Sequence, residues 1–191
     1  MGRDSMAISG RILARDEIRG IWAIDRSEVI DAVYYLEDGV LVLKPEHYDM
    51  RGWPPGAADK HTPELEACYD DGGWFFGLFD DHRLTGVAVL GSRFVGKQPR
   101  MLQLEFLHVS SQYRHQGLGT QLFNLAAAEA RRRGAEWMYI SATPSEHTIG
   151  FYLQLGCRVT PEPDPELFEL EPEDIHLEYD LGAIDIPHCA S

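Results

Sequence analysis

One stretch of this chain carries most of the information about its fold: Val109-Ser110-Ser111-Gln112-Tyr113-Arg114-His115-Gln116-Gly117-Leu118-Gly119-Thr120. An apolar strand ends here, a short polar turn follows, and a helix is expected to begin at the two glycines. Such a helix start presents unpaired backbone N–H groups at the positive end of the helix dipole. Glycine lets the backbone approach a ligand closely, because no Cβ intervenes. The stretch therefore predicts a binding site for phosphate oxygens.

Two familiar phosphate-binding loops do not fit this stretch. A nucleoside-triphosphate loop requires Gly-Lys-Ser/Thr, and the stretch has no lysine. A dinucleotide-binding loop requires a third small residue three positions after the second glycine, where this chain has Leu122. A Rossmann-type nucleotide binder is disfavoured for this reason, and also because several strands precede the helix.

Periodicity on both sides of the stretch predicts a mixed α/β fold in a single domain over residues 1–191. Strands are predicted at 30–36, 40–43, 74–79, 83–93, 100–109, 137–141, 157–160 and 175–181. Helices are predicted at 14–23, 62–70, 117–133 and 145–155. Asp38-Gly39 marks the turn of an N-terminal hairpin, at about residues 30–43. Thr62-Pro63 is predicted to be the N-cap and first residue of its helix.

Composition limits the partners of the chain. Its net charge is −14, which argues against nucleic acid and favours a cationic small molecule or basic peptide. No apolar run approaches the roughly 20 residues needed to span a bilayer, and no secretion signal is visible at the start. Cys68, Cys157 and Cys189 are odd in number and widely spaced, so we expect a reducing cytoplasm. The histidines show no metal-ligand spacing, and we expect no metal.

The glycine stretch resembles a known family when it is combined with a second segment. Arg114-His115-Gln116-Gly117-Leu118-Gly119 resembles the Gln/Arg-x-x-Gly-x-Gly/Ala signature of the GNAT superfamily of N-acetyltransferases. Phe151-Tyr152-Leu153-Gln154-Leu155-Gly156 is similar to the family's Phe-Tyr-x-x-x-Gly-Phe segment, at a suitable spacing. The resemblance covers residues 102 to about 160 and leaves residues 1–60 without a signature. It implies an α+β fold with a mostly antiparallel central sheet of about six or seven strands, flanked by about four helices.

The resemblance also implies an activity and a donor site. The acetyl group of acetyl-CoA would pass to a primary amine of a small molecule or peptide by direct attack, with no covalent enzyme intermediate. The strand would diverge from its neighbour and bind the pantetheine arm through the backbone of Leu107, His108 and Val109. The donor pyrophosphate would lie on the N–H groups of Arg114, His115, Gln116, Gly117, Leu118, Gly119 and Thr120. Ser145 stands where many members have an asparagine, and it can cap its helix.

The catalytic groups follow the resemblance only in part. Tyr152 falls where many members have a tyrosine that protonates the departing thiolate, and a phenol is a suitable acid for a thiolate. Some members place a glutamate base where this chain has Gln103, which cannot accept a proton. Glu105 lies two residues further on, so strand alternation predicts the same face and makes it the candidate base. The same alternation predicts that His108 points away from Glu105. Cys157 follows Gly156, at the position where the family's Phe-Tyr-x-x-x-Gly-Phe segment has its last phenylalanine.

Three questions stay open on the sequence alone. The chain could use another acyl-CoA donor, or it could be a non-catalytic acyl-CoA-binding sensor. Its hairpin is either an elaboration of the acceptor side or a contact in a homodimer. Residues 161–174 hold seven carboxylates and no basic residue and are predicted to form an acidic loop. The resemblance implies that this segment, between the last two strands, borders the acceptor cleft, where its charge would attract a cation. In that case the acceptor would be cationic.

Overall fold

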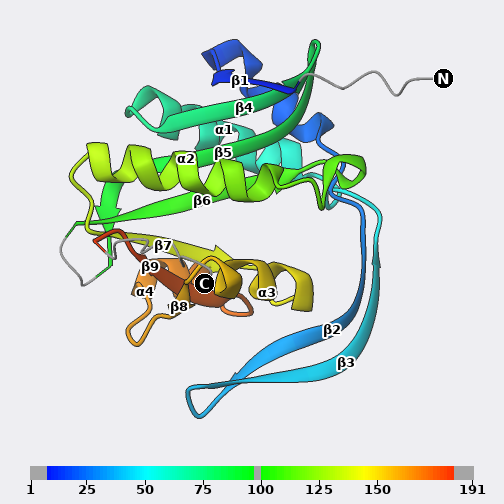
Figure 1. Ribbon diagram of the computed structural model, residues 1–191, viewed down its shortest axis with the longest axis vertical. Coiled ribbons are helices and arrows are strands. Elements are labelled where there is room, and N and C mark those ends of the chain that lie inside the picture. The colour runs from blue at the N-terminus through cyan, green and yellow to red at the C-terminus, as the bar shows by residue number, and fades with distance from the viewer. Residues whose placement is uncertain (1–7, 97–99, 183–191) are drawn as a thin grey trace, which may run out of the picture.

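The computed structural model describes residues 8–96 and 100–182, and within them a seven-stranded sheet organises the molecule (Figure 1). The strand order is β1-β4-β5-β6-β7-β9-β8. Only β6 and β7 run parallel, and the other neighbouring pairs are antiparallel. These strands are β1 (Ile8–Ile12), β4 (Trp74–Asp80), β5 (Arg83–Val95), β6 (Met101–Val109), β7 (Trp137–Ala142), β8 (Arg158–Val159) and β9 (Ile175–Asp180). The mixed, mostly antiparallel sheet confirms the predicted fold class.

Helices cover both faces of the sheet. On one face lie α2 (Leu118–Arg132) and α3 (Glu146–Gln154), whose apolar sides pack on alternate residues of the central strands. On the other face lie the 3₁₀ segment η1 (Arg15–Ala23) and α1 (Ala57–Asp70), which enclose a second apolar cluster. This second face also carries α4 (Pro165–Leu170), where the Phe168 ring packs at a tilt against His176, with 5.3 Å between ring centroids. The shorter 3₁₀ segment η2 (Ser111–Tyr113) joins β6 to α2.

The sheet opens between β6 and β7. These two strands pair only from Met101 to Gln103 on β6 and from Trp137 to Tyr139 on β7. Beyond Gln103, β6 continues to pair with β5 on its other side as far as Val109. Residues 104–109 therefore keep one edge free of β7 pairing, which leaves backbone hydrogen-bonding groups available on that edge. The divergence of two parallel strands agrees with the splayed strand expected from the sequence.

A β-bulge at Glu105 changes the alternation of β6. Leu104 pairs with Leu90 and Phe106 pairs with Val89, so Glu105 is the extra residue opposite no partner. Leu104 and Leu107 contact the α2 side, whereas Phe106 packs on the η1 and α1 side. The prediction that His108 points away from Glu105 is therefore wrong. The bulge places both side chains on the face that carries α1, since Glu105 contacts Cys68 of α1 and His108 meets Phe106 edge to face at 5.4 Å between ring centroids.

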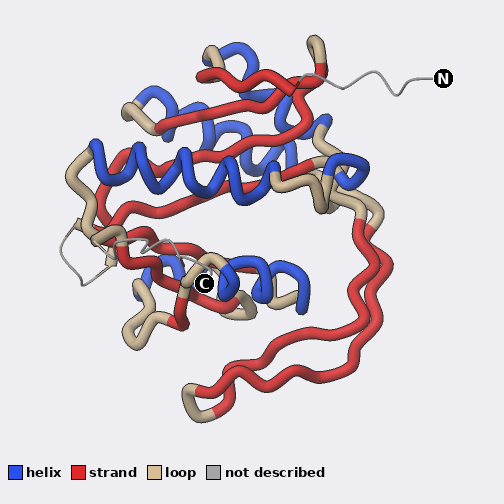
Figure 2. The backbone as a smooth tube through the Cα atoms, in the orientation of Figure 1, coloured by secondary structure: helices blue, strands red, loops and turns tan. Residues whose placement is uncertain are grey.

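A long hairpin leaves the body of the molecule between η1 and α1. It consists of β2 (Glu28–Glu37) and β3 (Val40–Met50), joined at the predicted Asp38-Gly39 turn. Figure 2 shows it curving around the open side of the sheet. The backbone N–H of Tyr34 donates to the Pro144 carbonyl at 2.7 Å, which attaches the hairpin to the start of α3. The strands of the hairpin extend well past the predicted limits of 30–43.

Three predicted boundaries differ from the structure. α1 begins at Ala57 after Gly56, so Pro63 lies inside the helix and Thr62 is not its N-cap. The Thr62 hydroxyl instead donates to the Ala58 carbonyl one turn earlier. The segment predicted as an acidic loop contains α4, whose N-cap Asp164 accepts hydrogen bonds from the N–H groups of Glu166 and Leu167. β1 was not predicted, because its edge-strand residues are mostly exposed and lack alternation. Cys189 lies outside the described residues.

Candidate functional site

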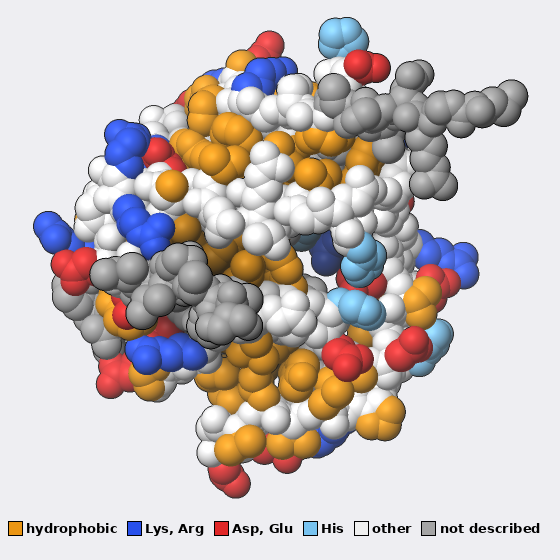
Figure 3. Space-filling view, in the orientation of Figure 1, with side chains coloured by type: hydrophobic (Ala, Val, Ile, Leu, Met, Phe, Trp, Pro, Cys, Tyr) orange, Lys and Arg blue, Asp and Glu red, His pale blue; other side chains and the backbone are white. Residues whose placement is uncertain are grey.

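A cleft of about 1330 Å³ occupies the opening between β6 and β7. Figure 3 shows the molecule hollowed between the hairpin and the main body. The cleft passes through the sheet, because residues from helices on both faces line it. From the α2 and α3 side these include Gly117, Gly119, Thr120, Gly150, Phe151 and Tyr152. From the α1 and α4 side they include Trp22, Trp53, Lys60, Glu64, Leu167 and Glu171.

The start of α2 faces this cleft with unpaired backbone donors. Gly117 is the N-cap with a φ of 80°, a left-handed conformation that glycine adopts without strain. Within the described residues, no acceptor takes a hydrogen bond from the N–H groups of residues 117–120. A Cβ on Gly119 would come 3.3 Å from the Phe151 ring, so glycine also keeps this wall open. The arrangement suits an anionic group with several acceptor oxygens.

Tyr152 reaches the cleft from the last turn of α3. Its ring is 6% exposed and packs on Phe123 and Phe151. Burial, together with the nearby Cys157 thiol, raises the pKa of the phenol well above its usual value. No described residue takes or gives a hydrogen bond at its hydroxyl, which lies at the cleft wall. The phenol is therefore protonated at neutral pH and free to donate into the cleft.

Glu105 enters the cleft from the opposite face of the sheet. Its carboxylate accepts a long hydrogen bond from the Cys68 thiol, with a sulfur–oxygen distance of 3.6 Å. Burial is the main cause that raises the pKa of Glu105, the Cys68 hydrogen bond opposes it, and the Glu64 charge raises it further. Burial and Glu105 together raise the pKa of the Cys68 thiol to about 12, so the sulfur is a neutral donor. A carboxylate with a raised pKa can take a proton from an ammonium more readily than an ordinary one.

An aromatic cluster forms the wall of the cleft beside Glu105. Trp22 and Trp53 meet edge to face with their centroids 4.8 Å apart, and both contact Phe106 at 6.2 Å. Both indole N–H groups are occupied, by the Thr62 hydroxyl and the Ile24 carbonyl. His108 contacts Trp53 at 4.9 Å; burial is the main cause that lowers its pKa, to about 3, so the imidazole is neutral. The ring positions are thus fixed, and the wall is uncharged.

Only two of the seven carboxylates in the acidic segment reach the cleft. Glu171 and Asp174 line it, whereas Glu162, Asp164 and Glu166 do not. Burial, followed by the charge of Glu171, raises the pKa of Asp174 to about 6. Asp164 is engaged elsewhere, since it caps α4 and accepts a hydrogen bond from the Gly96 N–H.

The predicted donor-site residues divide into two groups. Most of them line the cleft: Leu107, His108, Val109, Arg114, His115, Gly117, Gly119 and Thr120. The other three, Gln116, Leu118 and Ser145, are not part of its lining. Ser145 is buried and caps α3, where its hydroxyl accepts a hydrogen bond from the Thr148 N–H at 3.2 Å. Arg114 donates to the Val109 and Ser27 carbonyls and so ties the glycine loop to the base of the hairpin.

Sequence reasoning missed the residues that enclose the second half of the cleft. These are Trp22, Arg26, Trp53 and Phe106. They come from four separate segments, and no short-range pattern connects them.

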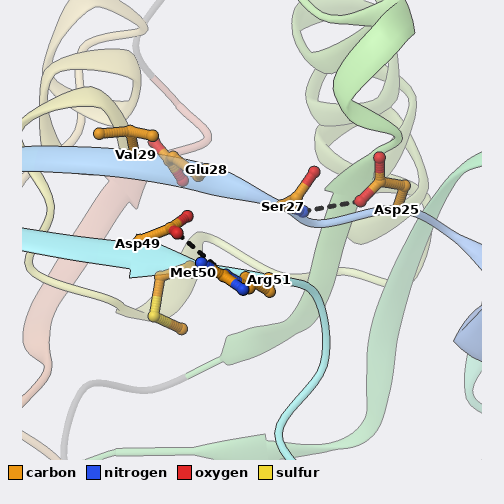
Figure 4. Close-up of a pocket in the computed structure, with 7 residues that line it drawn as sticks. All are labelled: Asp25, Ser27, Glu28, Val29, Asp49, Met50 and Arg51. Carbon is orange, nitrogen blue, oxygen red and sulfur yellow. Dashed lines mark hydrogen bonds and ion pairs between the residues drawn. The ribbon is translucent and has the colours of Figure 1, made fainter.

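A second, shallower depression of about 550 Å³ lies at the base of the hairpin (Figure 4). Its charged groups are already satisfied. Arg51 pairs with Asp49 at 2.9 Å, and Asp25 accepts a hydrogen bond from the Ser27 N–H. Glu28 lies within reach of Arg114 and His147. The charged groups of this depression therefore bond to each other and to nearby residues, and few are available to a ligand.

Residues 8–96 and 100–182 lack two features. No helix there is long and apolar enough to cross a membrane. No group of three or more His, Cys, Asp or Glu side chains there is arranged to hold a metal ion.

Solved structures of several acetyltransferases share this fold. Nourseothricin acetyltransferase superimposes with a TM-score of 0.69 at 21% identity, over 92% of this chain and 99% of that one. The PaiA N-acetyltransferase of Thermoplasma acidophilum, solved with coenzyme A, gives 0.59 at 16% identity, over 92% and 99%. The ribosomal-protein-S18-alanine N-acetyltransferase of Escherichia coli gives 0.58 at 14%, over 95% and 98%. At such identities the likeness shows the fold alone.

The sequence itself decides the family. It has no significant match among curated proteins. The model of the acetyltransferase (GNAT) family, however, matches residues 43–157, which is more than half of the chain. The chain therefore belongs to the GNAT acetyltransferase family and is an acyltransferase.

Proposed function

We propose that this protein transfers the acetyl group of acetyl-CoA to a primary amine, within the cleft between β6 and β7. The observation that carries the proposal is the opening of the sheet itself. It joins the unpaired N–H groups of residues 117–120, on one face, to Glu105 and the aromatic wall on the other. Donor and acceptor can thus approach each other from opposite faces and meet between the two strands.

The donor half of the cleft fits the parts of coenzyme A. The N–H groups at the start of α2 suit a pyrophosphate, since they combine free donors with the positive end of a helix dipole. The free edge of residues 104–109 suits a pantetheine arm, whose amides need both donors and acceptors. The PaiA N-acetyltransferase, which has a similar fold, was solved with coenzyme A, which supports coenzyme A as a ligand of this protein.

Tyr152 and Glu105 supply the proton transfers that the reaction needs. The amine nitrogen attacks the thioester carbonyl carbon, a C–N bond forms and the C–S bond breaks. The phenol of Tyr152 gives its proton to the departing thiolate, and its raised pKa keeps that proton in place until then. Glu105 accepts the proton that the amine loses, directly or through one water. Both groups reach the cleft from rigid elements, which favours correct positioning.

Charge on the acceptor side favours a substrate with a positive amine. Four carboxylates line this half, from Glu64, Glu105, Glu171 and Asp174. The basic side chains in the same half are Arg26 and Lys60. A cationic amine would be attracted by the surplus of negative charge, and its apolar part would contact the aromatic wall.

A thiol-release assay tests the proposal. Acetyl-CoA is incubated with the protein and a panel of amino acids, polyamines, aminoglycosides and peptide N-termini. We expect acceptor-dependent release of coenzyme A and a mass increase of one acetyl group on the acceptor. Propionyl-CoA and succinyl-CoA, run in parallel, establish the acyl preference. If coenzyme A binds tightly but no acceptor causes thiol release, the non-catalytic sensor replaces the transferase.

A further inference from the structure

Arg26 is a partly buried cation in the cleft to which the described residues supply no counter-ion. It lies between η1 and β2, and its guanidinium carbon is 4.9 Å from the centroid of the Trp53 ring. Within residues 8–96 and 100–182, no carboxylate forms an ion pair with it and no acceptor takes a hydrogen bond from it. Other partly buried arginines differ, since Arg133 pairs with Glu129 and Arg114 donates to two carbonyls.

The carboxylates nearest to Arg26 are held by other groups. Glu28 and Asp174 act on its pKa through their charges, but Glu28 lies within ion-pair distance of Arg114 and His147. Asp174 accepts a hydrogen bond from the Ser141 hydroxyl at 3.3 Å. Burial lowers the pKa of the guanidinium, yet it stays charged, because an arginine does not lose its proton in a protein.

A buried guanidinium without partners is costly to the folded protein. Its five N–H donors lose water when the cleft is filled, and the Trp53 ring replaces only part of that interaction. An arginine fork is well matched to a carboxylate, which can accept two parallel hydrogen bonds. Arg26 lies over the Trp53 ring, which also contacts His108, and this places its donors at the aromatic wall in the acceptor half of the cleft.

We infer that Arg26 binds a carboxylate on the acceptor, and that the acceptor is an α-amino acid or a similar small amino-carboxylate. The inference rests on the proposed acetyl transfer to an amine. The carboxylate lies on Arg26, the ammonium faces Glu105 and Asp174, and an apolar side chain packs on Trp22 and Phe106. Such an acceptor has a carboxylate for Arg26 and an ammonium for the carboxylates of the cleft. A polyamine has no group that could bind Arg26 in this way.

Matched pairs of acceptors test this inference. L-phenylalanine is compared with L-phenylalaninamide, and L-lysine with L-lysinamide, in the thiol-release assay. For wild-type protein we expect the KM of the acid to be about 10-fold or more below that of the amide, the range of a hydrogen bond to a charged group. In Arg26→Gln this preference should disappear, through a higher KM of the acid and little change for the amide. Arg26→Lys should keep part of it.

Two controls separate the inference from the proposed function. Arg19→Gln removes an exposed arginine of η1 that pairs with Glu66 outside the cleft, and it should leave the preference intact. Calorimetric titration of the same acids and amides into the protein with coenzyme A present measures the preference without turnover.

The outcomes distinguish the subsite from the activity. A lack of thiol release with a retained, Arg26-dependent preference for the acid would overturn the proposed transferase activity but keep the carboxylate subsite. Equal affinity for acid and amide in the wild type, or a preference that survives in a folded Arg26→Gln variant, would overturn the inference. A rise in the KM of acetyl-CoA alone would overturn it too, by assigning Arg26 to the donor.

Discussion

Glu105 and Tyr152 reach one cleft from opposite faces of the same sheet. Glu105 lies at a bulge of β6 beside Cys68 of α1, whereas Tyr152 belongs to α3 and packs on Phe123 of α2. Both line the opening between β6 and β7. A proton acceptor and a proton donor placed in this way can act on the two ends of one transfer, the attacking amine and the leaving thiolate.

Replacing Tyr152 by phenylalanine tests the proposed acid. Tyr152→Phe keeps the ring that packs on Phe123 and removes only the hydroxyl. We expect kcat to fall by about 10²-fold or more, with the affinity for coenzyme A nearly unchanged. Tyr179→Phe is the matched control, because its ring also packs on Phe123 but does not line the cleft. Equal rates per folded molecule for wild type and Tyr152→Phe would make Tyr152 a core residue.

Replacing Glu105 by glutamine tests the proposed base. Burial raises the pKa of this carboxyl, so the acidic limb of kcat/KM should lie above the ordinary range for glutamate. As the pH falls through that raised pKa, Glu105 gains a proton and can no longer accept one from the amine. Glu105→Gln should lower the rate by about 10²-fold and remove this limb. Glu66→Gln, on the outer side of α1, should preserve both rate and profile. If the acidic limb of the pH profile persists in Glu105→Gln, another group is the base.

The acidic edge of the cleft should affect acceptor binding through charge. Neutralising Glu171 and Asp174 together, as Glu171→Gln/Asp174→Asn, should raise the KM of a cationic acceptor several-fold at low salt and less at 0.5 M salt, about where screening becomes short-ranged. Glu166→Gln/Glu169→Gln removes the same charge from the same segment, away from the cleft lining. Equal KM values for the two double variants at low salt would contradict a contribution of Glu171 and Asp174 to acceptor binding.

Asp174 should also make stability depend on pH. Its pKa is raised from 3.8 to about 6 in the folded state, so the folded protein binds more protons than the unfolded chain between these values. The free energy of unfolding should therefore decrease as the pH rises from about 4 to about 6, by on the order of 1 kcal/mol after solvent screening. Urea unfolding of Asp174→Asn should show a flatter profile over that interval. Parallel profiles for variant and wild type would contradict the raised pKa.

The part of the fold that could be predicted from sequence is the part encoded locally. Alternation, the two glycines and the Asp38-Gly39 turn each act within a few residues, and the sheet from β4 to β9 follows from them. The bulge at Glu105 could not be predicted, because it arises from the pairing of β6 with β5. The acceptor half of the cleft could not be predicted from the sequence for a similar reason. Arg26, Trp53 and Asp174 meet only after distant segments pack together. α1 begins at Ala57 after the N-cap Gly56, so Thr62 lies inside the helix, where its hydroxyl bonds to the Ala58 carbonyl instead of capping a helix start.

Donor binding depends on the start of α2, which is proposed to hold the pyrophosphate of coenzyme A. Calorimetric titration of coenzyme A into Gly119→Asp tests it most directly, because the new carboxylate would stand among the N–H groups proposed to hold the phosphates. Gly20→Asp adds the same side chain to η1, where only Leu84 lies within 4.0 Å of the new Cβ. We predict that wild type and Gly20→Asp bind coenzyme A alike, and that a folded Gly119→Asp protein loses about 10²-fold or more in affinity. Unchanged affinity in folded Gly119→Asp would contradict the account.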